Sequence, residues 1–227
     1  MMLCSLALAA VVAAATAAPP TPPPEPNHIT VEAIQSFLRT SGDGWNKGMG
    51  LASGVSVRYE LQATPKLRLA NTLHWERVSS TWQGRYPGGT FLTWFHFTDY
   101  DDELDVELGH PEYPTGIGIG YFDYTPIHDG PTTYNLTGIG FGVDKWPNYY
   151  VPRSYYGSLW YYPSMRSGTP GEGVYGILRA DAGVNFRFNL LKPWNLRLGV
   201  AADSWFGRAG GADTGFAGPY VAFTYWR

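Results

Sequence analysis

The stretch Leu178–Leu190, LRADAGVNFRFNL, alternates apolar residues with polar residues or glycine along its whole length. Its even-numbered positions hold Leu, Ala, Val and Phe, whereas its odd-numbered positions hold Arg, Asp, Gly and Asn. Successive side chains of a β-strand point to opposite faces of a sheet. The pattern therefore predicts a strand with one apolar and one polar face.

Similar alternation recurs on both sides of this stretch. It covers 55–61, 67–76, 94–109, 117–121, 139–143, 194–203 and 220–226. A further strand is expected at 155–162, which is very aromatic and carries no charge on either face. Residues 29–42 suit either a short amphipathic helix or a first strand, and we favour the strand because it makes the strand count even. The sequence predicts an all-β, antiparallel, up-and-down transmembrane β-barrel of about ten strands, with about eight as the alternative.

The connections between these segments alternate in length. Short turns are expected at 63–66, 111–114 and 191–193, and longer loops at 81–91, 163–172 and 207–215. Outer-membrane barrels have short periplasmic turns and longer external loops. The connection at 146–153 is longer than a periplasmic turn should be.

Composition bears on which face of the barrel is apolar. The 227 residues include 15% charged and 16% aromatic residues, and the net charge is −3. Soluble domains carry about 25% charged residues, and no basic footprint indicates nucleic acid. A soluble, lipocalin-like ligand-binding barrel has the same alternation with its apolar face inside. The membrane form is favoured because the polar face is poor in Lys and because Trp and Tyr cluster near strand ends.

The alternation assigns side chains to two faces of the barrel wall. On the lumen face we expect a charge network of Arg58, Glu60, Arg68, Glu76, Asp99, Asp101, Glu103, Asp105, Glu107, Arg179, Asp181, Arg187, Arg197 and Asp203. On the lipid face we expect Val57, Leu69, Leu104, Val106, Ile119, Phe141, Val184, Phe186, Leu198, Val200 and Phe223. Unpaired buried charges are costly, so the lumen Arg side chains should pair with the carboxylates. The expected neighbours are Arg179 with Asp203, Arg187 with Asn195, Glu60 with Arg68, and Arg58 and Arg68 with Asp105 or Glu107.

Residues 1–17 have the features of a signal peptide. An apolar run precedes Ala15-Thr16-Ala17, an A-x-A cleavage pattern, although no Lys or Arg comes before it. A transmembrane anchor is the alternative, but the run is rich in Ala and ends in prolines. Cys4, the only cysteine, falls in this segment, so the mature chain is expected to lack disulfides and metal–thiolate sites. We expect a proline-rich spacer over 18–28 and the barrel over 29–227.

Two residue sets were candidates for catalysis. His74 and Glu76 with Ser79 or Ser80 form a possible set for activating a hydroxyl nucleophile. A lumen histidine bonded to a carboxylate explains the same residues more simply. His96 with Asp99 and Asp101 is similar to the acid–histidine set of an outer-membrane protease, but His96 has the opposite strand parity.

Two further patterns were candidates for ligand binding. The acidic row from Asp99 to Glu107 offers oxygens of the kind that Ca²⁺ prefers, but a single strand does not form a cage, so pairing with Arg is favoured. The alternating glycines at 116–120 lack the following helix of a phosphate loop and fit a lumen-facing strand. The sequence therefore predicts no metal, no cofactor and no enzymatic activity.

Two segments resemble the periplasmic hairpins of small bacterial outer-membrane barrels of the OmpA-like or OmpX-like kind. They are YELQATPKLRL at 59–69 and FNLLKPWNLRL at 188–198. The last strand, with Val221, Phe223 and Tyr225 on one face, resembles the C-terminal signal read by the barrel-assembly machinery, but it ends in Trp226-Arg227.

This resemblance implies a location in the bacterial outer membrane, with outer-membrane lipid and the assembly machinery as partners. It implies a role in envelope integrity, in surface contact or as a narrow pore, with the monomer favoured. An outer-membrane enzyme acting on lipid A or phospholipid is the alternative.

Overall fold

The computed structural model describes residues 27–41, 47–64, 66–86, 89–110, 112–124, 134–167, 174–188, 193–206 and 213–226. They form ten strands: β1 (Asn27–Ser41), β2 (Lys47–Thr64), β3 (Leu67–Tyr86), β4 (Gly89–His110), β5 (Tyr113–Tyr124), β6 (Tyr134–Lys145), β7 (Arg153–Ser167), β8 (Val174–Phe186), β9 (Trp194–Phe206) and β10 (Asp213–Trp226). The predicted signal peptide and most of the predicted spacer lie outside the described residues. Nowhere in the described part of the chain is there a helix long and apolar enough to span a membrane.

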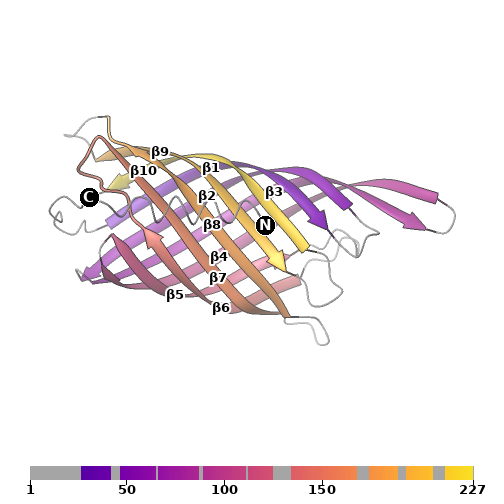
Figure 1. The fold of residues 1–227 in the computed structure, drawn as a ribbon, viewed down its shortest axis with the longest axis horizontal. Helices are drawn as coiled ribbons and strands as arrows, with labels where there is room; N and C mark the ends of the chain where they lie inside the picture. Colours follow the sequence, from indigo (N-terminus) through magenta and orange to yellow (C-terminus); the bar gives the residue numbers. More distant parts are fainter. Residues whose placement is uncertain are drawn as a thin grey trace.

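The ten strands close into one antiparallel barrel (Figure 1). Each strand pairs with the next along the chain, and β1 also pairs with β10, for example Val31 with Phe223. Closure gives every strand two neighbours and removes the sheet edges within the barrel body. The predicted barrel of about ten strands is confirmed, and of the ambiguous residues 29–42, those up to Ser41 belong to β1.

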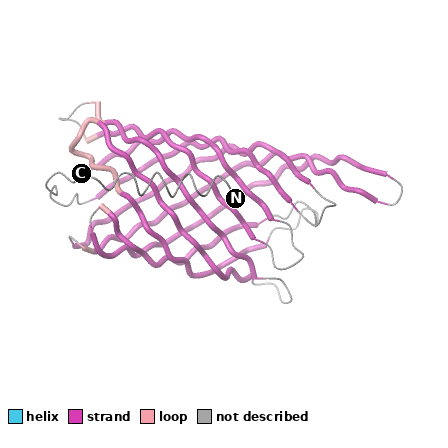
Figure 2. The backbone as a smooth tube through the Cα atoms, viewed as in Figure 1, coloured by secondary structure: helices cyan, strands magenta, loops and turns pink. Residues whose placement is uncertain are grey.

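The two ends of the barrel differ in shape (Figure 2). At the turn end lie the connections β2–β3, β4–β5, β6–β7 and β8–β9, together with the start of β1 and the end of β10. At the opposite end, the hairpin end, β3 has 20 residues and β4 has 22, whereas β5 has 12. Strands β3 and β4 are therefore much longer than β5, which makes the hairpin end uneven.

The loop predicted at 81–91 is wrong, because β3 continues to Tyr86 and β4 begins at Gly89. The sequence on both sides of Pro87-Gly88 is rich in Thr, Phe, Trp and Tyr, which favour strands and outweigh the Gly and Pro signals. The strand predicted at 178–190 is displaced in a similar way. β8 spans Val174–Phe186, so Arg187 and Phe188 lie beyond its end.

Strand β4 shows how the two faces of the wall differ. Asp101, Glu103, Asp105 and Glu107 are at most 7% exposed, whereas Leu104, Val106 and Leu108 are 38–54% exposed. Of the predicted lipid-face residues, most are exposed, and Leu69, Val184 and Phe186 are half-buried. A soluble barrel has the reverse arrangement. This wall presents apolar side chains outward and charged side chains inward, as a membrane barrel does.

Aromatic side chains of β7 fill one side of the lumen. Trp160 and Tyr162 point inward and are buried against the glycines of β6. A Cβ atom added to Gly142 would lie 2.1 Å from a Trp160 ring carbon, and one added to Gly140 would lie 2.5 Å from a Tyr162 ring carbon. The alternating glycines therefore make room for rings that cross the lumen.

Candidate functional site: a charged lumen closed at one end

The acidic face of β4 is the common element of the lumen. Its carboxylates face two arginines on other strands, Arg58 on β2 and Arg179 on β8. Each arginine contacts several carboxylates, and we call the resulting groups the Arg58 centre and the Arg179 centre.

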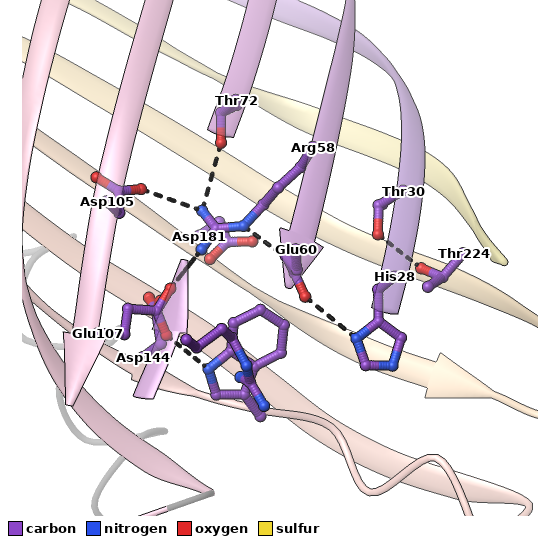
Figure 3. Close-up of polar contacts among 12 residues, drawn as sticks. His28, Thr30, Arg58, Glu60, Thr72, Asp105, Glu107, Asp144, Asp181 and Thr224 are labelled. Atoms are coloured by element: carbon purple, nitrogen blue, oxygen red, sulfur yellow. Dashed lines mark hydrogen bonds and ion pairs between the residues drawn. The ribbon is translucent and has the colours of Figure 1, made fainter. Parts of the chain in front are cut away.

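The Arg58 centre joins β2, β4 and β6 (Figure 3). Nε of Arg58 donates to Oε1 of Glu60 at 2.8 Å, and Nη2 donates to Oε1 of Glu107 at 2.8 Å. The guanidinium also lies 3.4 Å from Asp144 and 3.8 Å from Asp105. The fork of an arginine suits several carboxylates at once, so one cation holds three strands together.

The Arg179 centre joins β8, β4 and β9. Nε and Nη2 of Arg179 donate to the two oxygens of Asp203 at 3.1 and 2.9 Å, which is a bidentate pair. The same guanidinium donates to Asp101 at 3.2 Å and to Glu103. The hydroxyl of Tyr162 donates to Glu103 at 2.6 Å. The expected neighbours Arg179 and Asp203 do face each other in the β8–β9 register.

Residues 146–152, which connect β6 to β7, fold into the turn end of the lumen, and we call them the capping segment. Trp146 is 6% exposed and Tyr149 is 4% exposed. Nε1 of Trp146 donates to Oε2 of Glu107 at 3.1 Å, which links the capping segment to the Arg58 centre. The guanidinium of Arg68 lies 3.8 Å from the centre of the Trp146 ring, a cation–π contact.

Tyr149 is held from three sides. Arg197 donates to its hydroxyl, Nη1 of Arg187 donates to its backbone carbonyl at 2.6 Å, and the His28 ring stacks on its ring at 4.7 Å. The amide of Arg187 also donates to the carbonyl of Pro152 at 2.9 Å. His28 on β1, Arg197 on β9 and Arg187 just after β8 therefore hold the capping segment in place.

The remaining predicted lumen residues have other partners. Arg68 lies opposite Gln62 and bonds to it, so the expected pair of Arg68 with Glu60 is wrong. The register shifts by one residue between Gln62 and Thr64, beside the turn. Asp181 accepts a hydrogen bond from Tyr220 at 2.7 Å. Side chains of Asp99, Ser80 and His96 lie outside the described set.

Two members of the candidate catalytic set lie together in the lumen, whereas the side chain of Ser80 is outside the described set. His74 and Glu76 are both buried, with Nε2 of His74 3.8 Å from Oε2 of Glu76. Ser79 has the parity of the outward residues Trp75 and Arg77, so it does not join them in the lumen. Among the residues described, no three His, Cys, Asp or Glu side chains are placed to hold a metal ion.

Sequence reasoning missed four residues of this site. Asp144 continues the inward parity of Gly138, Gly140 and Gly142, and that signal was available. The positions of Trp146, Tyr149 and His28 had no such signal, because two of them lie in a connection without periodicity and the third lay in the predicted spacer. Some space remains beside the described lumen residues. A cavity of about 140 Å³ lies beside both arginine centres, and one of about 60 Å³ lies beside the capping segment.

No known protein-family model matches this sequence, and no curated protein matches it. Solved structures do match. The outer membrane protease OmpT from Escherichia coli aligns with a TM-score of 0.52 at 10% identity, over 88% of this chain and 97% of that chain.

Two autotransporter structures also match. For the translocator domain of NalP from Neisseria meningitidis the TM-score is 0.44 at 12% identity, over 100% of this chain and 95% of that chain. For the transport unit of AIDA-I from Escherichia coli it is 0.42 at 11% identity, over 98% of each chain. The match to OmpT concerns the fold alone, and by that fold this chain is a β-barrel of the bacterial outer-membrane type.

Proposed function

We propose that this protein is an outer-membrane barrel with a closed lumen, whose role is structural or in contact at the cell surface. The observation that carries the proposal is the filling of the lumen. Two arginine centres cross it, and the capping segment covers its turn end through Trp146 and Tyr149. A ten-stranded barrel is narrow, so side chains of this size fill it.

Ion conductance in planar bilayers tests the closed lumen. The unmodified protein should show no stable open state. The double variant Trp146→Ala, Tyr149→Ala removes the two buried rings of the capping segment and should increase conductance. The matched control is Tyr155→Ala, which removes an exposed ring from the outer face. Stable conductance by the unmodified protein would contradict the proposal.

The membrane placement rests on the outward apolar face. Leu198 is exposed on β9, and Leu198→Arg places a charge there, at a cost of about 2–4 kcal/mol near the middle of the bilayer. We expect this variant to lose insertion and the heat-modifiable gel mobility of a folded barrel. Leu198→Ala is the control and should insert. Normal insertion of the Arg variant would argue against the outward face lying in lipid.

Three finer points belong to the same proposal. We infer a monomer that resembles small OmpA-like or OmpX-like barrels and is inserted by the barrel-assembly machinery through β10. We also infer a non-enzymatic role, because the pairing of His74 with Glu76 accounts for this histidine without a nucleophile. Expression in a surrogate host followed by mass spectrometry of lipid A checks this, and a mass change would instead support the enzyme.

A further inference from the structure

The hairpin of β3 and β4 projects beyond the other strands at the hairpin end of the barrel (Figure 1). Strand β4 pairs with β3 as far as Tyr86–Gly89, but its pairing with β5 ends at Asp101–Phe122. On its other side, β3 is paired with β2 up to Gln83. Among the described strands, residues 89–100 of β4 therefore have a single neighbour, and we call their unpaired side the β4 edge.

An edge of this kind presents a row of backbone N–H and C=O groups without strand partners. Natural edges are blunted by Pro, Lys or a β-bulge. The sequence GTFLTWFHFTDY at 89–100 contains neither Pro nor Lys, and its register with β3 has no shift. It is rich in Thr, Phe and Trp, which favour strands. Both the backbone and the sequence are thus suited to accept another strand.

The chain itself offers a poor strand for this position. The connection from β5 to β6, residues 125–133, begins closest to the β4 edge in the order of strands. Its sequence TPIHDGPTT contains Pro126 and Pro131, which have no N–H to donate to a ladder. These prolines make the connection a poor occupant of the edge, which favours a strand from another polypeptide.

We propose that the β4 edge is a β-augmentation site for an extended, uncharged segment of a partner protein. Main-chain hydrogen bonds supply the binding in this mode. Asp99 is the one residue of the sequence 89–100 that is fully charged at neutral pH, so a neutral segment meets little charge there. The inference specifies the surface-contact part of the proposed function and does not depend on the lumen being closed.

The test uses disulfide trapping, because the mature chain is expected to contain no cysteine. Thr93→Cys places a thiol on the β4 edge strand. The control Thr137→Cys places one on β6, where the backbone pairs with β5 and β7 and the side chain is exposed. The probe is a nine-residue peptide of alternating Thr and Val with a central Cys. A second peptide carries Pro at alternate positions and cannot form a ladder.

We expect the Thr93→Cys protein to trap the first peptide about tenfold faster than the Thr137→Cys protein does, because pairing raises the local concentration of the thiol. The proline peptide should show no such difference. Equal trapping at the two positions would overturn the proposal. Disulfide-linked dimers of Thr93→Cys that form without peptide would overturn it as well, because the occupant would then be a second copy.

Two further measurements keep the result interpretable. Heat-modifiable gel mobility confirms that each cysteine variant is folded. Conductance of the same samples reports on the lumen, so a failure of the closed-lumen proposal is seen separately from a failure at the β4 edge. Adding Phe95→Lys to Thr93→Cys should reduce trapping of the first peptide, because a charged lysine blunts an edge.

Discussion

The Arg58 centre and the Arg179 centre have similar construction but different surroundings. Both join the acidic face of β4 to another part of the wall through one guanidinium. The carboxylates of Glu60 and Glu107 beside Arg58 are at most 1% exposed, whereas that of Asp203 beside Arg179 is 23% exposed. Glu107 also accepts the bond from Trp146 of the capping segment. The side chains of Arg58 and Arg179 are similarly exposed, at 22% and 16%, so the centres differ in their carboxylates. Those around Arg58 are enclosed by protein, whereas Arg179 has one partly solvated partner.

Two arginine centres of similar construction can therefore contribute differently to stability within one lumen. Removing an arginine leaves its carboxylates without a counter-charge, and the cost depends on how well water replaces the guanidinium. Water reaches Asp203 more easily than it reaches Glu107. The enclosed centre should therefore contribute more to the free energy of unfolding.

The largest effect is expected from Arg58→Ala. It leaves Glu60, Glu107 and Asp144 buried without their cation, and breaking a buried pair from one side costs about 3–5 kcal/mol. Urea unfolding in lipid vesicles measures the loss. The double variant Arg58→Ala, Glu107→Gln is the control and should recover part of it. A loss below that of Arg179→Ala would contradict the comparison.

A smaller loss is expected from Arg179→Ala, about 1.5–3 kcal/mol, the range for hydrogen bonds to charged groups. The reason is the partial exposure of Asp203, which lets water take over some of the lost bonds. Arg179→Lys keeps the charge but loses the bidentate geometry. Its free energy of unfolding should lie between those of Arg179→Ala and the unmodified protein. The same urea titration compares all three proteins.

Substitution of a β6 glycine tests how tightly the lumen is packed around the Arg179 centre. Gly140→Val adds side-chain atoms where Tyr162 lies, and overpacking costs about 1–3 kcal/mol. Because Tyr162 bonds to Glu103, the strain should act on the Arg179 centre. Gly176→Ala is the matched control, since its nearest neighbouring atom would be 3.6 Å away. Equal urea midpoints for the two variants would show that the Tyr162 ring has room to move.

The smallest effect is expected from Trp146→Phe, about 1 kcal/mol, because only the bond from Nε1 to Glu107 is lost while a ring remains over Arg68. The free energy of unfolding lost in Trp146→Phe can be compared with that lost in Tyr155→Phe, a change on the outer face that should be neutral. A loss as large as that of Arg58→Ala would mean that the capping segment, and not Arg58, carries the stability of this centre.

Much of the wall was predictable because side-chain alternation is a local property. The acidic face of β4, the outward Leu and Val residues and the facing of Arg179 and Asp203 all follow from a period of two and from neighbouring hairpins. The register at 62–68 was not predictable in this way, because a single irregular residue near a turn shifts every later pair.

The sequence by itself determined the barrel and which face of each strand is apolar, since both depend on residues that are near one another in the chain. The tertiary structure alone decided that Arg58 meets Asp144, that the capping segment enters the lumen and that β4 runs on past β5. Those features join strands that are distant in sequence. Their positions depend on how far each strand is staggered when the sheet closes, and no local pattern records that stagger.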